Sequence, residues 1–145
     1  MTRSHEEVEA LTETVIVCAI EVHRTLGPGL VESVYRESMI LELQEKHLTV
    51  EDERYVPLDY KGHRVNGNLK LDLLVEGCVV VELKAVERLH PVYLAQVITY
   101  LKLTGCPAGL LMNFNATTLK AGLKRLDHPD KYVKKTSNSC PSDVL

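Results

Sequence analysis

The chain has 145 residues, a length that suits one domain with a core of its own. It contains no uncharged apolar run of about 18 residues, so we expect no membrane-spanning helix and no membrane partner. Its net charge of −3 argues against an indiscriminate coat on nucleic acid.

Two helices are expected in the first third of the chain. Ser4 and Glu7 have the spacing of a capping box, and apolar residues then recur in steps of three and four up to Leu26. Gly27-Pro28-Gly29 ends this helix, and a second helix is predicted from Leu30 to about Lys46. Its inward positions are expected to be Val31, Val34, Tyr35, Met39 and Leu43.

Residues 53–84 have the pattern of several strands. A first strand is predicted over 53–60, with Pro57 suggesting an edge position, and a short one at 64–65. The next covers 69–75, and Val79-Val80-Val81 is typical of a central strand buried on both faces.

The loop between the last two strands decides which polar residues meet. A two-residue turn at Glu76-Gly77 sets Asp72 opposite Val81, whereas a three-residue loop that includes Cys78 sets Asp72 opposite Glu82. Glu82 and Lys84 are two apart on a strand and so share one face. Only the three-residue loop, or an equivalent bulge, gathers these polar groups.

The second half continues with a helix from His90-Pro91 to Thr104, with His90 as its N-cap, and a strand over 108–114. A last helix is predicted from Thr117 or Thr118 to Leu126, and residues 127–145 are expected to form a mobile polar tail. The last helix would turn Leu119, Leu123 and Leu126 inward and Lys120, Lys124 and Arg125 outward. This order of elements predicts a single α/β domain over 1–126, with a small mixed sheet flanked by helices.

Asp72, Glu82 and Lys84 form the candidate active site. Two carboxylates can hold Mg²⁺ or Mn²⁺ through oxygen, and a lysine can steer a metal-activated water or stabilise phosphate charge. This pattern suits metal-dependent phosphodiester cleavage. The alternative is a salt-bridge cluster on a solvated sheet face, although a Glu and a Lys are costly inside a buried strand unless they are paired or bound to metal.

Charge is distributed unevenly along the chain. Residues 1–60 carry a net charge of −8, whereas residues 61–145, which contain the candidate site, carry +5. A basic half would favour phosphate binding, and the Lys120, Lys124 and Arg125 side chains are a candidate phosphate-contacting patch. Two solvated faces of opposite sign would give the same distribution.

Three motifs together resemble known proteins. Residues 29–35 (GLVESVY) look like the signature of the GxxExxY proteins. Asp72, Glu82-Leu83-Lys84 and Gln96-x-x-x-Tyr100 are similar to the motif set of the PD-(D/E)xK nuclease superfamily, in its RecB-like branch. The resemblance spans about residues 5–126, and its one departure is Leu71, where the superfamily has proline.

The resemblance implies a restriction-endonuclease-like core. It implies that Asp72 and Glu82 are metal ligands and Lys84 the catalytic lysine, with Glu32 as a further acidic ligand from the first core helix. Gln96 and Tyr100 would lie beside the metal and contact substrate. From the residues alone, Glu32 could be a helix N-terminal acid.

Two further residues have alternatives of their own. Tyr35 could orient Glu32 through its hydroxyl or simply pack, and packing is preferred. Gln96 is expected to point inward, with its hydrogen bonds satisfied.

The expected protein is therefore a metal-dependent nuclease that uses Mg²⁺ or Mn²⁺ and cleaves nucleic acid, with DNA favoured over RNA. The alternative is a catalytically silent nucleic-acid-binding or protein-interaction module on the same fold. Residues 1–13 lack a secretory signal, so a cytoplasmic location with reduced cysteines is expected. A homodimer formed through the acidic half is a further hypothesis.

Overall fold

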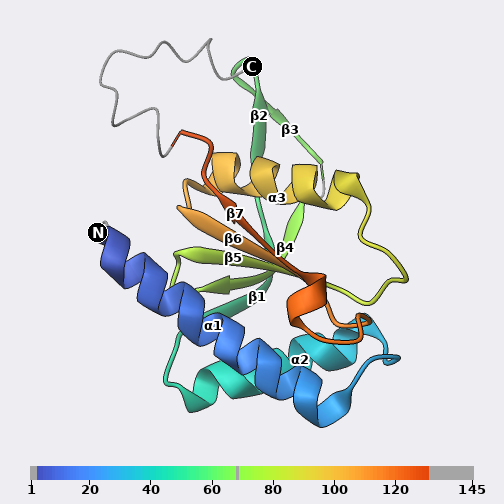
Figure 1. Ribbon diagram of the computed structural model, residues 1–145. Helices are drawn as coiled ribbons and strands as arrows, with labels where there is room; N and C mark the ends of the chain where they lie inside the picture. The colour runs from blue at the N-terminus through green and yellow to red at the C-terminus, as the bar shows by residue number, and fades with distance from the viewer. Residues whose placement is uncertain (1–2, 68, 131–145) are drawn as a thin grey trace.

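A computed structural model describes residues 3–67 and 69–130. Five strands form one mixed sheet in the order β1-β4-β5-β6-β7, and β2 pairs with β3 in a separate hairpin (Figure 1). The elements are α1 (His5–Leu26), α2 (Glu32–Glu45), β1 (Val50–Tyr55), β2 (Leu58–Tyr60), β3 (His63–Val65), β4 (Lys70–Val75), β5 (Val79–Lys84), α3 (Pro91–Thr104), β6 (Ala108–Asn113), the 3₁₀ turn η1 (Lys120–Gly122) and β7 (Leu123–Asp127). This is the predicted mixed sheet flanked by helices.

The sheet separates two apolar layers. Helices α1 and α2 cover one face and α3 covers the other (Figure 1). Strand β5 lies third of five and is buried from Val79 to Leu83, as its unbroken valine run predicts. The larger layer includes Val15, Tyr35, Met39, Leu43, Leu73, Val81, Leu110 and Met112.

The connection between α1 and α2 is held by the side chain of Tyr35. Its hydroxyl donates to the Gly27 carbonyl at 2.6 Å and accepts from the Leu30 N–H at 3.1 Å. Its ring is fully buried and stacks on Phe114, with the centroids 4.7 Å apart. Tyr35 is thus a packing residue, as preferred, and its hydroxyl is engaged by the loop instead of by Glu32. Helix α2 begins at Glu32, and Val31 is 65% exposed instead of inward.

Replacing Tyr35 by phenylalanine should lower the free energy of unfolding by roughly 1–3 kcal/mol, because two loop groups lose their partner while the ring stack remains. Urea denaturation measures this change. Tyr60→Phe, which removes a hydroxyl from an exposed ring, is the matched control and should change stability by less than about 0.5 kcal/mol. Equal effects of the two substitutions would contradict this role for the Tyr35 hydroxyl.

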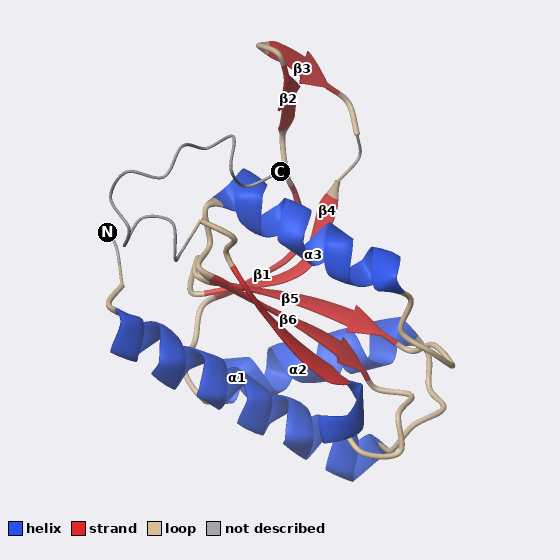
Figure 2. Cartoon of the chain, turned by 45° about the horizontal axis from the view of Figure 1, so that its top comes forward, coloured by secondary structure: helices blue, strands red, loops and turns tan. Residues whose placement is uncertain are grey.

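The strand predicted over 53–60 divides into two at Pro57. Strand β1 pairs with β4 up to Tyr55, and the Val56 N–H still donates to the Leu69 carbonyl. Proline has no N–H with which to continue the ladder, and the chain leaves the sheet to form the β2–β3 hairpin. Figure 2 shows this hairpin standing away from the layers.

The last predicted helix is wrong. Residues 120–122 form a single 3₁₀ turn, and β7 then pairs antiparallel with β6. The leucine spacing fits a helix, but β6 is buried along its length, and β7 satisfies the backbone groups on its outer edge. Leu123 packs on the α1–α2 side of the sheet, and Leu126 packs on the α3 side.

Other expectations concern the termini, thiols and membranes. Cys18, Cys78 and Cys106 are buried free thiols, as expected, whereas Cys140 and most of the predicted tail lie outside the described residues. No helix in the described part of the chain is long and apolar enough to cross a membrane.

Candidate active site

The candidate site lies where β4 and β5 stop pairing, between residues 70–72 of β4 and 82–84 of β5, which we call the fork. Strand β5 pairs with β6 along its whole length, from Val79 to Lys84, but with β4 only over 79–81. In the part of β4 before Leu73, residues 70–72, the strand leaves β5 and continues paired with β1 (Figure 2). The register pairs Val75 with Val79, so the loop between them has three residues and brings Asp72 opposite Glu82. The odd-length loop that the site requires is therefore present.

The two carboxylates close the fork by reciprocal hydrogen bonds. Glu82 Oε1 accepts from the Asp72 N–H at 3.1 Å, and Asp72 Oδ2 accepts from the Leu83 N–H at 2.8 Å. These bonds satisfy backbone donors at the point where the ladder between β4 and β5 has ended. Within the described residues, no further N–H or O–H group donates to either carboxylate.

Burial makes the charged form of Glu82 costly. Only 6% of this residue is exposed. Burial first, and the Asp72 carboxylate second, raise the pKa of Glu82 to about 8, whereas the bond from the Asp72 N–H and the charge of Lys84 act in the opposite direction. Two carboxylates held this close favour a cation between them.

Glu32 reaches the same electrostatic environment from the first turn of α2. Burial raises the pKa of Glu32, and the charge of Asp72 raises it further, while Lys84 and then Arg36 oppose the change. Arg36, one turn along α2, has its guanidinium 3.6 Å from Glu53 and a buried Nε that lacks a hydrogen-bond partner among the described residues. The structure thus brings Glu32 toward Asp72 and Lys84, and adds Arg36, which was not predicted.

Lys84 and Tyr100 also gather at the fork. Lys84 Nζ lies 4.5 Å from the ring centroid of Tyr93, in the first turn of α3. Tyr100 is buried, and its pKa is raised by burial and then by the charges of Glu82 and Asp72. Tyr93 was missed, although it lies seven residues before Tyr100 and so on the same side of the helix.

The remaining predicted substrate-binding residues lie farther out. Gln96 is exposed on α3, one turn before Tyr100, and not inward with satisfied hydrogen bonds. Lys120 is exposed in η1, and Lys124 is exposed on β7, so they do not share a helix face. Lys124 lies opposite Leu111, which in turn lies opposite Glu82, and this places it two strands from the carboxylates on the α3 side.

Asn113 fixes the chain that follows Lys84. Its Oδ1 accepts from the N–H of Val86 at 3.1 Å and of Asn115 at 3.2 Å, and its Nδ2 donates to the Val86 carbonyl at 2.9 Å. The Phe114 N–H donates to the Lys84 carbonyl at 2.8 Å. The end of β5 is thus tied to the end of β6. An asparagine closing an otherwise apolar strand was the only sequence signal of this role.

Asn113→Ala should lower the free energy of unfolding by roughly 1–3 kcal/mol, because backbone groups of the half-buried Val86 lose their partner, and should reduce catalysis by loosening Lys84. Thermal melts and cleavage rates on the same preparation measure both effects. Asn115→Ala is the control, since it removes only a 3.4 Å side-chain bond to Val86 and keeps its backbone bond. If the control lost as much stability and activity, this positioning role would be wrong.

The donor chemistry of the fork fits a hard divalent cation. Among the described residues, no three His, Cys, Asp or Glu side chains stand close enough to hold a metal alone. Mg²⁺ usually keeps several waters and takes one or two carboxylates together with substrate phosphate, and Asp72 and Glu82 supply that pair. Within the described residues these carboxylates accept no further hydrogen bond, and this and the raised pKa of Glu82 are what such a site would show before the cation binds.

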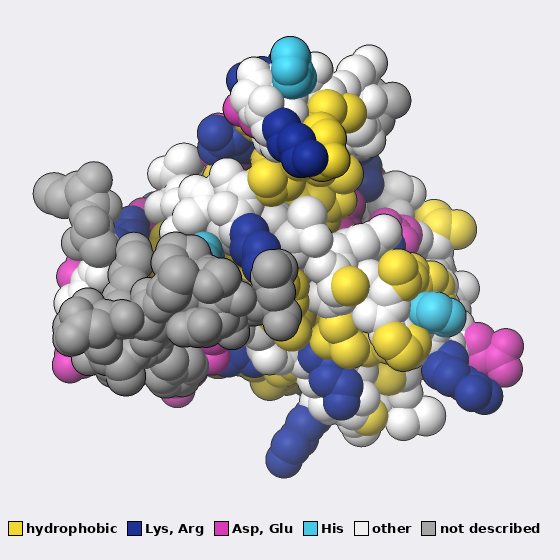
Figure 3. All heavy atoms as spheres, turned by 90° about the horizontal axis from the view of Figure 1, so that it is seen from above, with side chains coloured by type: hydrophobic (Ala, Val, Ile, Leu, Met, Phe, Trp, Pro, Cys, Tyr) yellow, Lys and Arg dark blue, Asp and Glu magenta, His cyan; other side chains and the backbone are white. Residues whose placement is uncertain are grey.

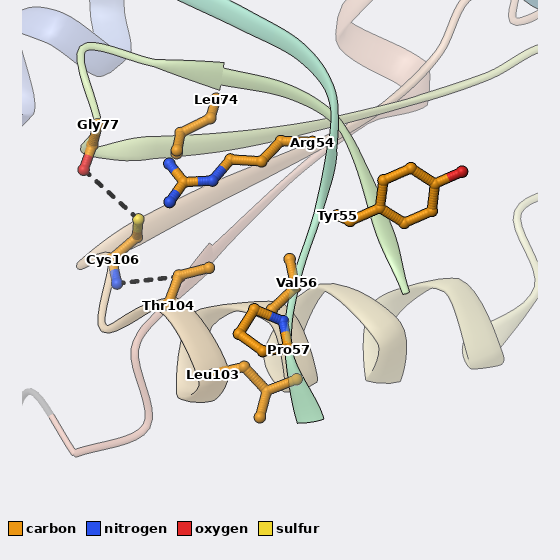
Figure 4. A pocket seen from close by; sticks show the side chains of 9 residues that line it. All are labelled: Arg54, Tyr55, Val56, Pro57, Leu74, Gly77, Leu103, Thr104 and Cys106. Carbon is orange, nitrogen blue, oxygen red and sulfur yellow. Dashed lines mark hydrogen bonds between the residues drawn. The ribbon is translucent and has the colours of Figure 1, made fainter. Parts of the chain in front are cut away.

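A separate pocket lies at the other end of β5. It has a volume of about 290 Å³ and is lined by residues from the end of β1, the β4–β5 loop and the end of α3 (Figure 4). Gly77 and Cys106 belong to its wall, so it adjoins the start of β5 and not Lys84. None of the predicted site residues lines this pocket.

Comparison with known proteins gives one match. A family model described as the PD-(D/E)XK nuclease superfamily matches residues 9–126. No curated protein and no solved structure is similar enough to the chain to count as a match. The superfamily resemblance and its fold are confirmed, whereas the GxxExxY family and the RecB-like branch stay predictions.

Proposed function

Because the chain belongs to the PD-(D/E)XK nuclease superfamily, we propose that it is a divalent-metal-dependent nuclease that hydrolyses phosphodiester bonds, with DNA favoured over RNA. The observation that carries the proposal is the fork, where Asp72 faces Glu82 across two strands and Lys84 follows on the same face. Superfamily membership alone would fit a chain that had lost these groups.

In this proposal Asp72 and Glu82 hold Mg²⁺ or Mn²⁺, with Glu32 as a third acidic group at the rim. The bound cation would polarise the scissile phosphate and lower the pKa of the attacking water. Lys84 would donate a hydrogen bond to that water or to the phosphate. Its positive charge would offset the negative charge that develops in the transition state.

The other residues position these groups. Tyr93 packs its ring against the Lys84 ammonium, and Asn113 holds the backbone beyond it. Tyr100 is buried on α3 close enough for the charges of Glu82 and Asp72 to raise its pKa. The exposed side chain of Gln96 is available to substrate at the rim, and Lys120 and Lys124 are proposed as more distant phosphate contacts.

The direct test is cleavage of labelled single- and double-stranded DNA and RNA with Mg²⁺ or Mn²⁺, and with EDTA in parallel. We expect metal-dependent cleavage of DNA that EDTA stops. Cleavage that persists in EDTA would contradict the proposed dependence on a divalent metal. Failure to cleave any of the four substrates, with the fold intact and Mn²⁺ bound, would favour the catalytically silent module.

A further inference from the structure

The β2–β3 hairpin, which we call the arm (residues 58–65), exposes aromatic side chains that the core does not use. Both strands have three residues, and every residue of β3 is exposed. So short a hairpin gains little stability of its own in water. Tyr60 is nevertheless 61% exposed and Val65 40% exposed. Packing within the domain therefore does not account for these side chains.

The register sorts the arm into two different faces. Tyr60 lies opposite His63 and Leu58 lies opposite Val65, so these four side chains share one face. Asp59 and Arg64 occupy the other face, where they form an ion pair at 2.7 Å. The charged groups of one face thus pair with each other. The other face exposes two neighbouring flat rings and a valine that a partner could contact.

Positive charge borders the aromatic face. Lys61 Nζ lies 5.3 Å from the ring centroid of Tyr60 at the tip. Toward the sheet, Lys70 Nζ lies 5.7 Å from the ring centroid of Tyr55, which is itself 65% exposed, but this ammonium is paired with Glu53 at 2.9 Å. Figure 3, which looks at this end from above, shows Lys and Arg side chains beside hydrophobic ones on the surface. Flat rings with the Lys61 ammonium beside them suit a ligand with flat apolar groups and negative charge.

The arm also continues the strands that form the candidate site. The Val56 N–H donates to the Leu69 carbonyl at its base, and only Lys70 and Leu71 separate Leu69 from Asp72. A chain lying on the arm would therefore be led along the β1–β4 ribbon toward the fork (Figure 2).

We propose that the arm binds unpaired bases of the nucleic-acid substrate by stacking them on Tyr60 and His63, with Lys61 beside the phosphates. Unpaired bases expose the ring faces that stacking requires, whereas paired bases in a duplex do not. The substrate is accordingly single-stranded nucleic acid or a single-stranded segment next to a duplex. This inference rests on the proposed nuclease function and narrows its substrate.

The test measures binding of a labelled single-stranded DNA 12-mer, and of the matching duplex, by fluorescence anisotropy in a Lys84→Ala background that prevents cleavage. Tyr60→Ala should weaken single-strand binding by roughly 5- to 100-fold, the range expected for loss of one stacked base. Duplex binding should change less than about 2-fold, and Tyr60→Phe, which keeps the ring, should bind as the parent does. In the active protein, Mn²⁺-dependent hydrolysis of bis(p-nitrophenyl) phosphate should survive Tyr60→Ala.

Several outcomes would overturn the arm proposal. Unchanged single-strand binding by Tyr60→Ala would do so, as would equal loss by Tyr60→Phe or a parent protein that prefers duplex. A change in self-association without a change in DNA binding would assign the face to a second copy of the chain. If the active protein cleaves DNA while any of these results holds, the nuclease function stands and only the arm proposal fails. If it cleaves no nucleic acid, the proposed function itself fails.

Discussion

Lys84→Ala is expected to reduce the rate constant for DNA cleavage by roughly 10²–10³-fold or more, while leaving the affinity for DNA within a few-fold of wild type. Lys84 stands at the end of β5, and its ammonium lies against Tyr93 without an ion pair among the described residues. Its charge is thus available to the reacting phosphate. Single-turnover cleavage with excess enzyme separates this chemical effect from binding.

Lys102→Ala is the charge-matched control for this experiment. Lys102 is exposed near the C-terminal end of α3 and should contribute little to the rate. Thermal melts should place both variants close to wild type, because the Lys84 ammonium makes no ion pair or hydrogen bond among the described residues. Cleavage by Lys84→Ala at the rate of the Lys102→Ala control would remove Lys84 from the mechanism.

Glu82→Gln should abolish metal-supported cleavage and yet stabilise the metal-free protein at pH 8. The pKa of Glu82 is raised to about 8, against about 4.5 for an ordinary glutamate. Between these pH values the folded chain keeps a proton that the unfolded chain has lost, so stability falls as pH rises from 4.5 to 8. Glutamine is neutral throughout, and the gain at pH 8 should be on the order of a few kcal/mol.

The measurement is urea denaturation of both proteins in EDTA at several pH values from 4.5 to 8.5. The two curves should nearly coincide at pH 4.5 and separate as pH rises. Glu87→Gln, on the exposed loop after β5, controls for a general change in net charge. Adding Mn²⁺ should raise the melting temperature of wild type more at pH 8 than at pH 6, because the cation stabilises the charged carboxylate. A separation of the curves that does not depend on pH would contradict the burial of Glu82 as its cause.

The relative placement of Asp72, Glu82 and Lys84 was predictable because it depends on one short stretch of sequence. A buried valine run, a three-residue loop and the two-residue period of a strand suffice to bring Asp72 opposite Glu82 and to place Lys84 on the same face. Strand and loop geometry alone left the loop length open. The requirement that the polar groups meet selected the odd length.

The structural features that could not be predicted from the sequence depend on tertiary contacts. Leu119, Leu123 and Leu126 have helical spacing, and only the free edge of β6 makes residues 123–127 a strand. Tyr93 was not predicted, because nothing in the neighbouring sequence places it against Lys84. Asn113 acts through the backbone of Val86, 27 residues earlier in the chain, which no local pattern contains.

The measurement that tests the metal site most directly is a calorimetric titration of Mn²⁺ into wild type and Asp72→Asn. Asparagine can still accept the Leu83 N–H, so the substitution removes a charge and leaves the fork closed. Asp59→Asn, on the face of the arm opposite Tyr60 and His63, is the matched control. We predict that wild type and Asp59→Asn bind Mn²⁺ alike, and that Asp72→Asn binds at least about tenfold more weakly. Equal Mn²⁺ affinity in all three proteins would show that the fork is not the metal site.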